Sequence, residues 1–303
     1  MGEVLLKALG FILVIIIGFS AKKWKILKKE DGNVLATIIM NITLPCALLS
    51  SVGDLQLNGA MLILLVLGVV FNIVMVIVGY YASSKYSPIR RAAYMINCSG
   101  YNIGNFTLPF AQSFFPGMGV AYLCMFDVGN AIMCLGGTFA IALGVCNNDE
   151  KISASSVAKR LVSSIPFMVY VVIFILSVFQ ISIPNSVLSV TNYIGNANGF
   201  LVMLMIGLLL EIKMDRRDVK DVFTILALRF SISIILAIAS YFLLPLPMLA
   251  KKVLVLSLLA PVSTMATVFS KRCGYEKDMP AVVNSLSIII SIILNIIVLM
   301  LFV

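Results

Sequence analysis

The sequence predicts an all-α polytopic membrane protein, on the basis of its composition, the placement of its charges and an internal repeat. Of its 303 residues, 61% are hydrophobic and 12% are charged, and the mean hydropathy is +1.09. A soluble domain has nearer half apolar and about a quarter charged residues. Because a membrane span needs roughly 20 apolar residues, this length has room for about ten spans with short loops and none for a soluble domain.

Ten apolar stretches follow one another along the chain, separated by short polar loops. They cover residues 4–20, 34–52, 60–81, 92–114, 120–144, 161–179, 187–210, 222–244, 252–270 and 281–303. No small-residue cleavage site is evident after the first stretch, and a lysine cluster follows it. We therefore expect the first stretch to be kept as a span and not removed as a signal peptide.

The distribution of positive charge predicts the orientation of these spans. The chain has 22 lysine and arginine residues against 13 acidic residues, for a net charge of +9. Most of the cations lie in the loops after the odd-numbered spans, whereas the opposite side has Lys7, Lys251 and Lys252. The positive-inside rule places the odd loops in the cytoplasm and both termini outside the cell membrane. The excess of cations is thus a topology signal, and we expect no nucleic-acid partner.

The ten spans divide into two halves of five, residues 1–146 and 147–303. An odd number of spans per half forces the halves to face opposite ways, which is the inverted-repeat plan. In each half the second span has a polar break led by asparagine (41–45 and 196–200), and the fourth span is broken at a proline, Pro109 or Pro261. We expect these prolines to break spans 4 and 9, and the two breaks to meet near the bilayer centre as crossover helices.

Residues 97–109 are the most unusual stretch, because a membrane helix is expected there and yet glycine, proline and three asparagines occur. Non-helical backbone at membrane depth is tolerated only where protein or a watery cavity surrounds it. Asn102 and Asn105 are the first candidates for binding a carboxylate, because an amide donates hydrogen bonds without the desolvation cost of a cation. The alternative is that both only cap the half-helices.

Further cavity candidates come from the other polar interruptions. Asn196 lies in span 7, and Ser263 and Thr264 follow Pro261 in span 9. Tyr101 could stack on an aromatic substrate, although packing is its more common role.

Asp127 is the only acidic residue well inside a span. An unpaired carboxylate there is costly, so it should be neutral, paired or functional, and a proton-coupling site is the specific hypothesis. The alternative is a salt bridge with Arg229 of span 8, or a solvated carboxylate on a cavity wall. Arg229 could itself bind a substrate anion, or pair or snorkel. Asn130 lies one turn from Asp127 on the same helix face and would join either role.

The sequence argues against metal and enzyme chemistry. Histidine is absent, and the six cysteines fall mostly within spans without a CxxC pair. We expect no metal and no cofactor, and one buried acid without a partner acid makes an intramembrane enzyme a weak hypothesis. A membrane-embedded sensor stays open as a hypothesis from another class, although an output domain is lacking.

Several short motifs in order along the ten spans resemble one family. They are Asn41-Ile42-Thr43-Leu44-Pro45, Asn102-Ile103-Gly104-Asn105-Phe106-Thr107-Leu108-Pro109, Gly195-Asn196 with Gly207-Leu208, and Leu259-Ala260-Pro261 followed by Gly274-Tyr275. The chain resembles the bacterial branch of the auxin efflux carrier family over essentially its whole length. One departure is Phe200, where many relatives have proline.

The resemblance implies a fold and a function. The fold is the inverted repeat shared with sodium/proton antiporters and bile-acid transporters, with a scaffold and a crossover domain. Family members move small organic anions such as auxins, malonate and malate, and plant members form dimers, so a homodimer is one expectation. The sequence thus predicts a secondary transporter of organic anions that works by alternating access in a lipid bilayer. Coupling to protons is one expectation, and coupling to sodium is the alternative.

Overall fold

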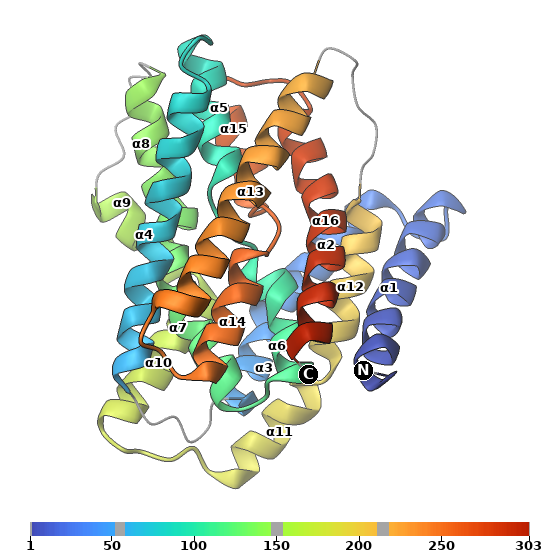
Figure 1. Cartoon of the computed structure of the whole chain (residues 1–303). Coiled ribbons are helices and arrows are strands. Elements are labelled where there is room, and N and C mark those ends of the chain that lie inside the picture. The colour runs from blue at the N-terminus through green and yellow to red at the C-terminus, as the bar shows by residue number, and fades with distance from the viewer. Residues whose placement is uncertain (1, 52–57, 147–153, 211–217, 303) are drawn as a thin grey trace.

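The computed structural model describes residues 2–51, 58–146, 154–210 and 218–302, and their regular structure is helical (Figure 1). The segments are α1 (Gly2–Lys23), α2 (Lys29–Ile38), η1 (Ile39–Thr43), α3 (Leu44–Ser51), α4 (Gly59–Ala82), α5 (Pro88–Cys98), η2 (Ile103–Thr107), α6 (Leu108–Phe114), α7 (Met118–Ile132), η3 (Met133–Gly137), α8 (Thr138–Val145), α9 (Ala154–Ser163), α10 (Ile165–Val178), α11 (Asn185–Gly195), α12 (Ala197–Leu209), α13 (Val219–Leu243), α14 (Met248–Leu258), α15 (Met265–Arg272) and α16 (Met279–Phe302). The all-helical fold class agrees with the sequence.

Among the described residues, six helices are long and apolar enough to cross a membrane, and a seventh if α9 and α10, bent by 85°, count as one span. The six are Lys29–Ser51, Gly59–Ala82, Met118–Val145, Asn185–Leu209, Val219–Leu243 and Met279–Phe302. At the remaining expected spans lie α1 and the interrupted pairs α5/α6 and α14/α15. These helices fit a polytopic membrane protein, and the count of ten stays a prediction.

Two of the expected interruptions are continuous helix. Residues 41–43 lie in a wide π-turn, η1, that passes directly into α3 at residues 44–45, and Asn196 joins α11 to α12 with helical backbone angles. The expected polar breaks in spans 2 and 7 are thus wrong as breaks. Asparagine disfavours helix only weakly, so its presence alone does not end one.

The motif Ile-x-Asn-x-Thr-Leu-Pro occurs twice, at 39–45 and 103–109, and forms the same structure each time. In both copies a π-turn covers the first five residues, and the amide of the leucine bonds to the carbonyl of the isoleucine five residues earlier. A proline ring clashes with the carbonyl four residues before it in a regular α-helix. The wide turn relieves that clash, so each proline shapes a helix without ending it.

The true interruptions are residues 99–102, here called the first break, and residues 259–264, the second break. They run antiparallel and cross, with Tyr101 paired to Val262. The amide of Asn102 donates to the carbonyl of Pro261 at 2.9 Å, and the amide of Ser263 donates to the carbonyl of Gly100 at 3.2 Å. Gly100 has φ +74°, a conformation that side-chain-bearing residues rarely adopt.

The expectation that prolines make both breaks is half correct. Pro261 lies inside the second break. Pro109 lies near the start of α6, several residues after the first break has ended. The first break instead forms at Gly100, whose left-handed backbone cannot continue a helix.

Two groups of helices pack closely within themselves. The scaffold group consists of α1, α2 to α3, and α11 to α12, in which α1 packs on α12 and α3 on α11. The crossing group consists of α4 to α8 and α13 to α16, in which α4 packs on α7 and α5. Each group relies on close glycine contacts: a Cβ on Gly207 would overlap the carbonyl of Ile15, and one on Gly129 that of Leu65.

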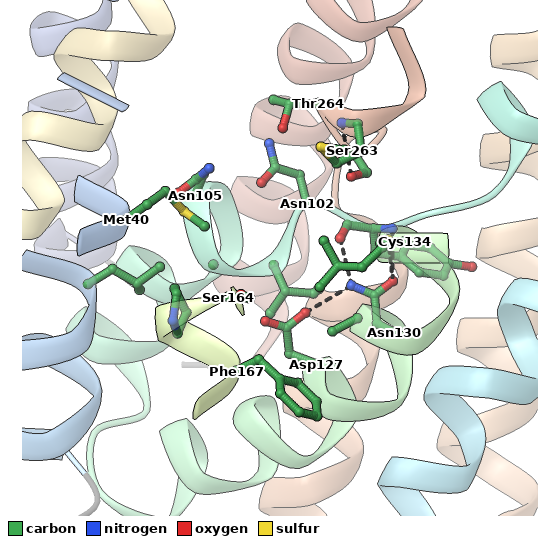
Figure 2. Close-up of a pocket in the computed structure, with 18 of the residues that line it drawn as sticks. Met40, Asn102, Asn105, Asp127, Asn130, Cys134, Ser164, Phe167, Ser263 and Thr264 are labelled. Carbon is green, nitrogen blue, oxygen red and sulfur yellow. Dashed lines mark hydrogen bonds between the residues drawn. The ribbon is translucent and has the colours of Figure 1, made fainter. Parts of the chain in front are cut away.

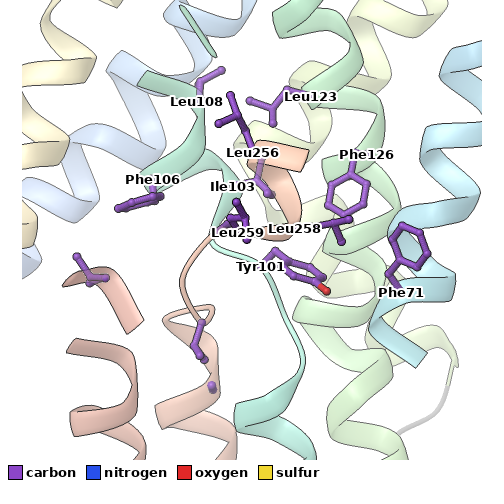
Figure 3. Packing of buried hydrophobic residues seen from close by; sticks show 14 of the residues in the cluster. Phe71, Tyr101, Ile103, Phe106, Leu108, Leu123, Phe126, Leu256, Leu258 and Leu259 are labelled. Atoms are coloured by element: carbon purple, nitrogen blue, oxygen red, sulfur yellow. The ribbon is translucent and has the colours of Figure 1, made fainter. Parts of the chain in front are cut away.

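A buried apolar cluster surrounds the crossing of the two breaks (Figure 3). Tyr101 and Ile103 of the first broken span lie beside Leu258 and Leu259 of the second, and Phe126 of α7 lies nearby. The packed side chains fix the position of otherwise irregular backbone within the membrane protein interior.

Candidate functional site

A small cavity of about 120 Å³ lies beside the crossing of the two breaks (Figure 2). Seven of the residues singled out from the sequence line it together: Tyr101, Asn102, Asn105, Asp127, Asn130, Ser263 and Thr264. They come from the first broken span, the second broken span and α7. Met40 and Leu44 of the scaffold group and Phe167 of α10 close the other sides. The cavity therefore lies between the two helix groups.

Asn102 presents an unused side chain to this cavity. It is 9% exposed and occupies the position before η2, where an asparagine commonly caps a helix. Its side chain makes no capping bond, and no other described residue bonds to that side chain. Asn105 likewise has a buried Oδ1 atom without a partner. The alternative that these residues serve as helix caps is thus not realised for Asn102.

The cavity lies at the start of two half-helices. Residues 103–105 begin the η2–α6 segment and Thr264 immediately precedes α15, and all of them line the cavity. Helix starts expose amide hydrogens and concentrate positive potential, equivalent to roughly +0.5 charge each. Together with the unused side-chain amide of Asn102, these ends suit an anion.

Asp127 faces the same cavity from α7. Its Oδ1 accepts from Asn130 Nδ2 at 2.9 Å, and its Oδ2 accepts from the hydroxyl of Tyr170 at 2.9 Å. No ion pair joins it to Arg229 among the described residues, so the salt bridge considered from the sequence is wrong. The carboxyl group is therefore held by neutral donors only.

Asn130 connects Asp127 to the backbone of the first break. Its Nδ2 donates to the carbonyl of Tyr101 at 2.8 Å, and its Oδ1 accepts from the amide of Tyr101 at 3.0 Å. Asn72 of α4 adds to this network by donating to Asn130 Oδ1 at 3.1 Å and accepting from the amide of Gly100 at 2.7 Å. The two asparagines satisfy backbone groups that the break removes from helical pairing.

Sequence reasoning missed Asn72 and Tyr170. Asn72 is the one asparagine inside the apolar stretch 60–81, and a buried polar residue in a span is a signal that could have marked it. Tyr170 lies in the middle of the stretch 161–179 and gave a weaker signal, because packing is the more common role of a tyrosine ring.

Arg229 lies at the crossing and does not line the cavity. It is fully buried in α13, and its guanidinium donates to carbonyls of both breaks. The expectation that it binds a substrate anion in the cavity finds no support in this position.

A second cavity, of about 460 Å³, is lined by two further candidates, Pro109 and Asn196, whereas Pro261 lies in the second break and lines neither cavity. It lies between α6 of the crossing group and α1, α3, α11 and α12 of the scaffold group. Gln112 lines it and donates to Ser51 Oγ at 3.0 Å and to the carbonyl of Ala47 at 3.3 Å. Pro109 and Asn196 are thus brought together with each other but not with Asn102.

The family comparison agrees with this geometry. The model of the family described as "Membrane transport protein", an auxin efflux carrier-type family, matches residues 4–300. The chain belongs to this membrane transport family. The resemblance proposed from the motifs of the sequence is thereby confirmed. A search of curated proteins finds no match.

Membership makes the protein a multi-pass membrane transporter, and this family is one of transporters and not of enzymes. The cavity at the crossing is the natural candidate for the substrate site of this transporter. Its polar groups gather where the helices are interrupted, as in other transporters with broken helices.

Proposed function

We propose that the protein is a secondary transporter of small organic anions, such as malonate, malate or auxin-like carboxylates, and that the cavity at the crossing binds the carboxylate. The unused side chain of Asn102, at the convergence of two half-helix starts, carries this proposal. A carboxylate would accept hydrogen bonds from the amide group and from the free backbone amides nearby.

The charges in the cavity favour coupling to protons. Two helix starts supply roughly one positive charge in total, which an ionised Asp127 offsets. A substrate anion and an ionised Asp127 in one small cavity repel each other. Binding of the anion is therefore favoured when Asp127 has taken up a proton, which links the two movements. A sodium gradient in place of the proton gradient is the alternative within the same fold.

The proposed architecture is ten spans in two inverted halves, residues 1–146 and 147–303. Both labelled chain ends lie at the same end of the bundle (Figure 1), which an even number of spans requires. The two breaks occur in the fourth expected span of each half and meet. The charge bias puts both termini outside the cytoplasmic membrane.

Alternating access is supported by the seam between the helix groups. The two cavities lie along one segment, η2–α6. Asn105 lines the smaller cavity at the crossing, and Gln112 lines the second cavity. At the seam between the groups, a Cβ added to Gly199 of the scaffold group would lie 3.9 Å from the Cβ of Pro109, an ordinary contact distance. At Gly199 the packing between the groups is therefore looser than the backbone contacts that Gly207 and Gly129 make within each group. We propose that the crossing group moves against the scaffold group and opens the cavities in turn.

Transport in proteoliposomes tests the proposal. Malonate, malate, succinate and indole-3-acetate are offered on a solid-supported membrane, each with a proton gradient, a sodium gradient or none. A current for one anion that grows with the proton gradient is expected. Because electroneutral transport makes no current, exchange of labelled for unlabelled anion is measured in parallel. If no anion of the panel gives either a current or exchange, the result would contradict an organic-anion carrier.

Cys134 allows the site itself to be tested. It lines the cavity and its thiol donates to Asn130 Oδ1 at 3.3 Å. In a variant that keeps Cys134 and replaces the other five cysteines, the transported anion should slow alkylation of this thiol by N-ethylmaleimide. A variant that keeps only Cys146, which does not line the cavity, is the control. Equal alkylation of Cys134 with and without the anion would place the substrate elsewhere.

A further inference from the structure

Arg229 joins the two breaks through its guanidinium group. It makes five hydrogen bonds: Nη1 donates to the carbonyls of Cys98 at 2.6 Å and Ser99 at 3.2 Å, and Nη2 to those of Gly100 at 2.9 Å, Ala260 at 3.1 Å and Pro261 at 3.1 Å. The first three carbonyls belong to the end of α5 and the first break, and the other two to the second break.

The position of Arg229 is unusual for a charge in a membrane protein. The residue is 0% exposed, and no carboxylate among the described residues pairs with it. A buried cation without a partner is strongly unfavourable, so the carbonyl groups must provide its counter-charge. The aromatic ring of Tyr101 adds to this, since the guanidinium lies 4.9 Å from its centroid.

The carbonyls that Arg229 binds are those that the breaks leave without helical partners. The ends of α5 and α14 each have unpaired carbonyls and the negative end of a helix dipole, about −0.5 charge. One arginine offsets both ends at once. The positive starts of η2–α6 and α15 are then left on the cavity side without an equal counter-charge.

We propose that Arg229 is a positioning residue of the anion site. By binding the carbonyls of both breaks, it keeps them crossed so that the two following half-helices start at the same cavity. This inference rests on the proposed function, because it assigns Arg229 an indirect role in binding the substrate anion.

An arginine fits this role better than a lysine. Its planar group has five donors in a fixed arrangement, so it can reach two chain segments at once, whereas an ammonium group is a compact charge with three donors. Methionine is similar to lysine in length and flexibility but has neither charge nor donor. Arg229→Lys and Arg229→Met thus form a matched pair that separates charge and hydrogen bonding from packing.

The experiment measures anion binding and the integrity of the crossing in the same variants. Binding uses the anions of the transport panel, malonate, malate, succinate and indole-3-acetate. Integrity is read from alkylation of Cys98 by N-ethylmaleimide, followed by mass spectrometry of its peptide. Cys98 is fully buried, and Arg229 binds its backbone carbonyl. Its thiol should therefore react only when the crossing opens. Lys220→Gln removes an exposed cation from the same helix as a control.

We expect Arg229→Met to lose more than about tenfold in anion affinity and to react at Cys98 more than about tenfold faster. Arg229→Lys should lie between this variant and the wild type in both measurements, and Lys220→Gln should match the wild type. If Arg229→Met does not fold, Arg229→Lys alone still decides, because wild-type affinity together with wild-type protection of Cys98 would overturn the inference.

The two readouts separate this inference from the proposed function. Faster reaction of Cys98 in Arg229→Met together with unchanged anion affinity would overturn the indirect role in binding. Unchanged protection of Cys98 would overturn the role at the crossing. A wild-type protein that neither binds nor transports any of the anions would contradict the proposed function, and Cys98 would still report on the crossing.

Discussion

Asparagine has two different roles around the crossing. Asn130 and Asn72 use their amide groups to bond the backbone of the first break, so they hold structure in place. Asn102 and Asn105 lie in the break or just after it and keep polar atoms without partners. Buried polar groups are nearly always satisfied, so the exceptions point to a ligand.

Asn102 should therefore affect binding more than folding. Replacement by alanine removes the amide that we assign to the carboxylate, and the variant should lose roughly tenfold to a hundredfold in affinity, as expected for a hydrogen bond to a charged group. Equilibrium binding of the transported anion to purified protein measures this. Asn41→Ala is the control, because Asn41 is exposed and bonds only within its own helix. An unchanged affinity would remove Asn102 from the site.

Asp127 should set the pH dependence of transport. The change Asp127→Asn keeps the shape of the side chain and mimics the neutral acid, so the site no longer needs to take up a proton before the anion binds. We expect this variant to exchange anions equally well across the pH range, including the alkaline end at which the wild type slows down. Exchange measured from about pH 5 to about pH 8, where proteins tend to be most stable, tests this.

Tyr170→Phe is the matched control for Asp127. It removes a donor to the same carboxyl group but keeps the acid, so a pH response should persist with an altered midpoint. A pH response that survives unchanged in Asp127→Asn would contradict the coupling role.

At the scale of elements, Gln112 connects the two helix groups. Its bonds to Ser51 and Ala47 join α6 to α3 across the proposed seam. If the groups move against each other, a covalent link at this point must stop transport. In a background without native cysteines, oxidation of the pair Gln112→Cys and Ser51→Cys should abolish exchange, and a reductant should restore it.

A second cysteine pair provides the control for this link. Asn97 of α5 bonds Ser270 of α15 at 2.9 Å, and both belong to the crossing group. A disulfide between cysteines at these two positions should leave exchange intact because the group moves as one body. Transport that continues through an oxidised 51–112 pair would contradict the proposed movement.

The elements also show which parts of the structure sequence reasoning could reach. The stretches that hold both breaks were found, because glycine and polar residues in an apolar span are visible in the sequence. Pro109 was misread, since proline marks a wide turn as well as a helix end, and only the backbone distinguishes them. Arg229 was misread too, because its partners are carbonyl groups, which no sequence pattern displays.

The candidate site was predictable in part for a similar reason. Seven of the eleven candidates converge on one cavity, since they lie in the two breaks, just after the first break, or opposite them on α7. Pro109 and Asn196 fall in the other cavity, on the far side of the η2 turn from the crossing. Asn72 contributes through a contact between spans that are distant in sequence, so its role needed the tertiary structure.

At the scale of the whole molecule, the charge bias predicts which end of the bundle faces the cytoplasm. The described loop after α4 follows an odd-numbered expected span, and the loop between α10 and α11 follows an even one. Positive charge crosses the membrane poorly during insertion, so the first loop should stay inside and the second should lie outside.

Labelling in intact cells tests this orientation. Ser84→Cys and Ile181→Cys place one thiol in each loop, at positions that are exposed. In a background without native cysteines, a membrane-impermeant maleimide should label the second variant in intact cells and the first only after permeabilisation. Labelling of both from outside would contradict the span count between the two loops. Labelling of the first alone would reverse the orientation.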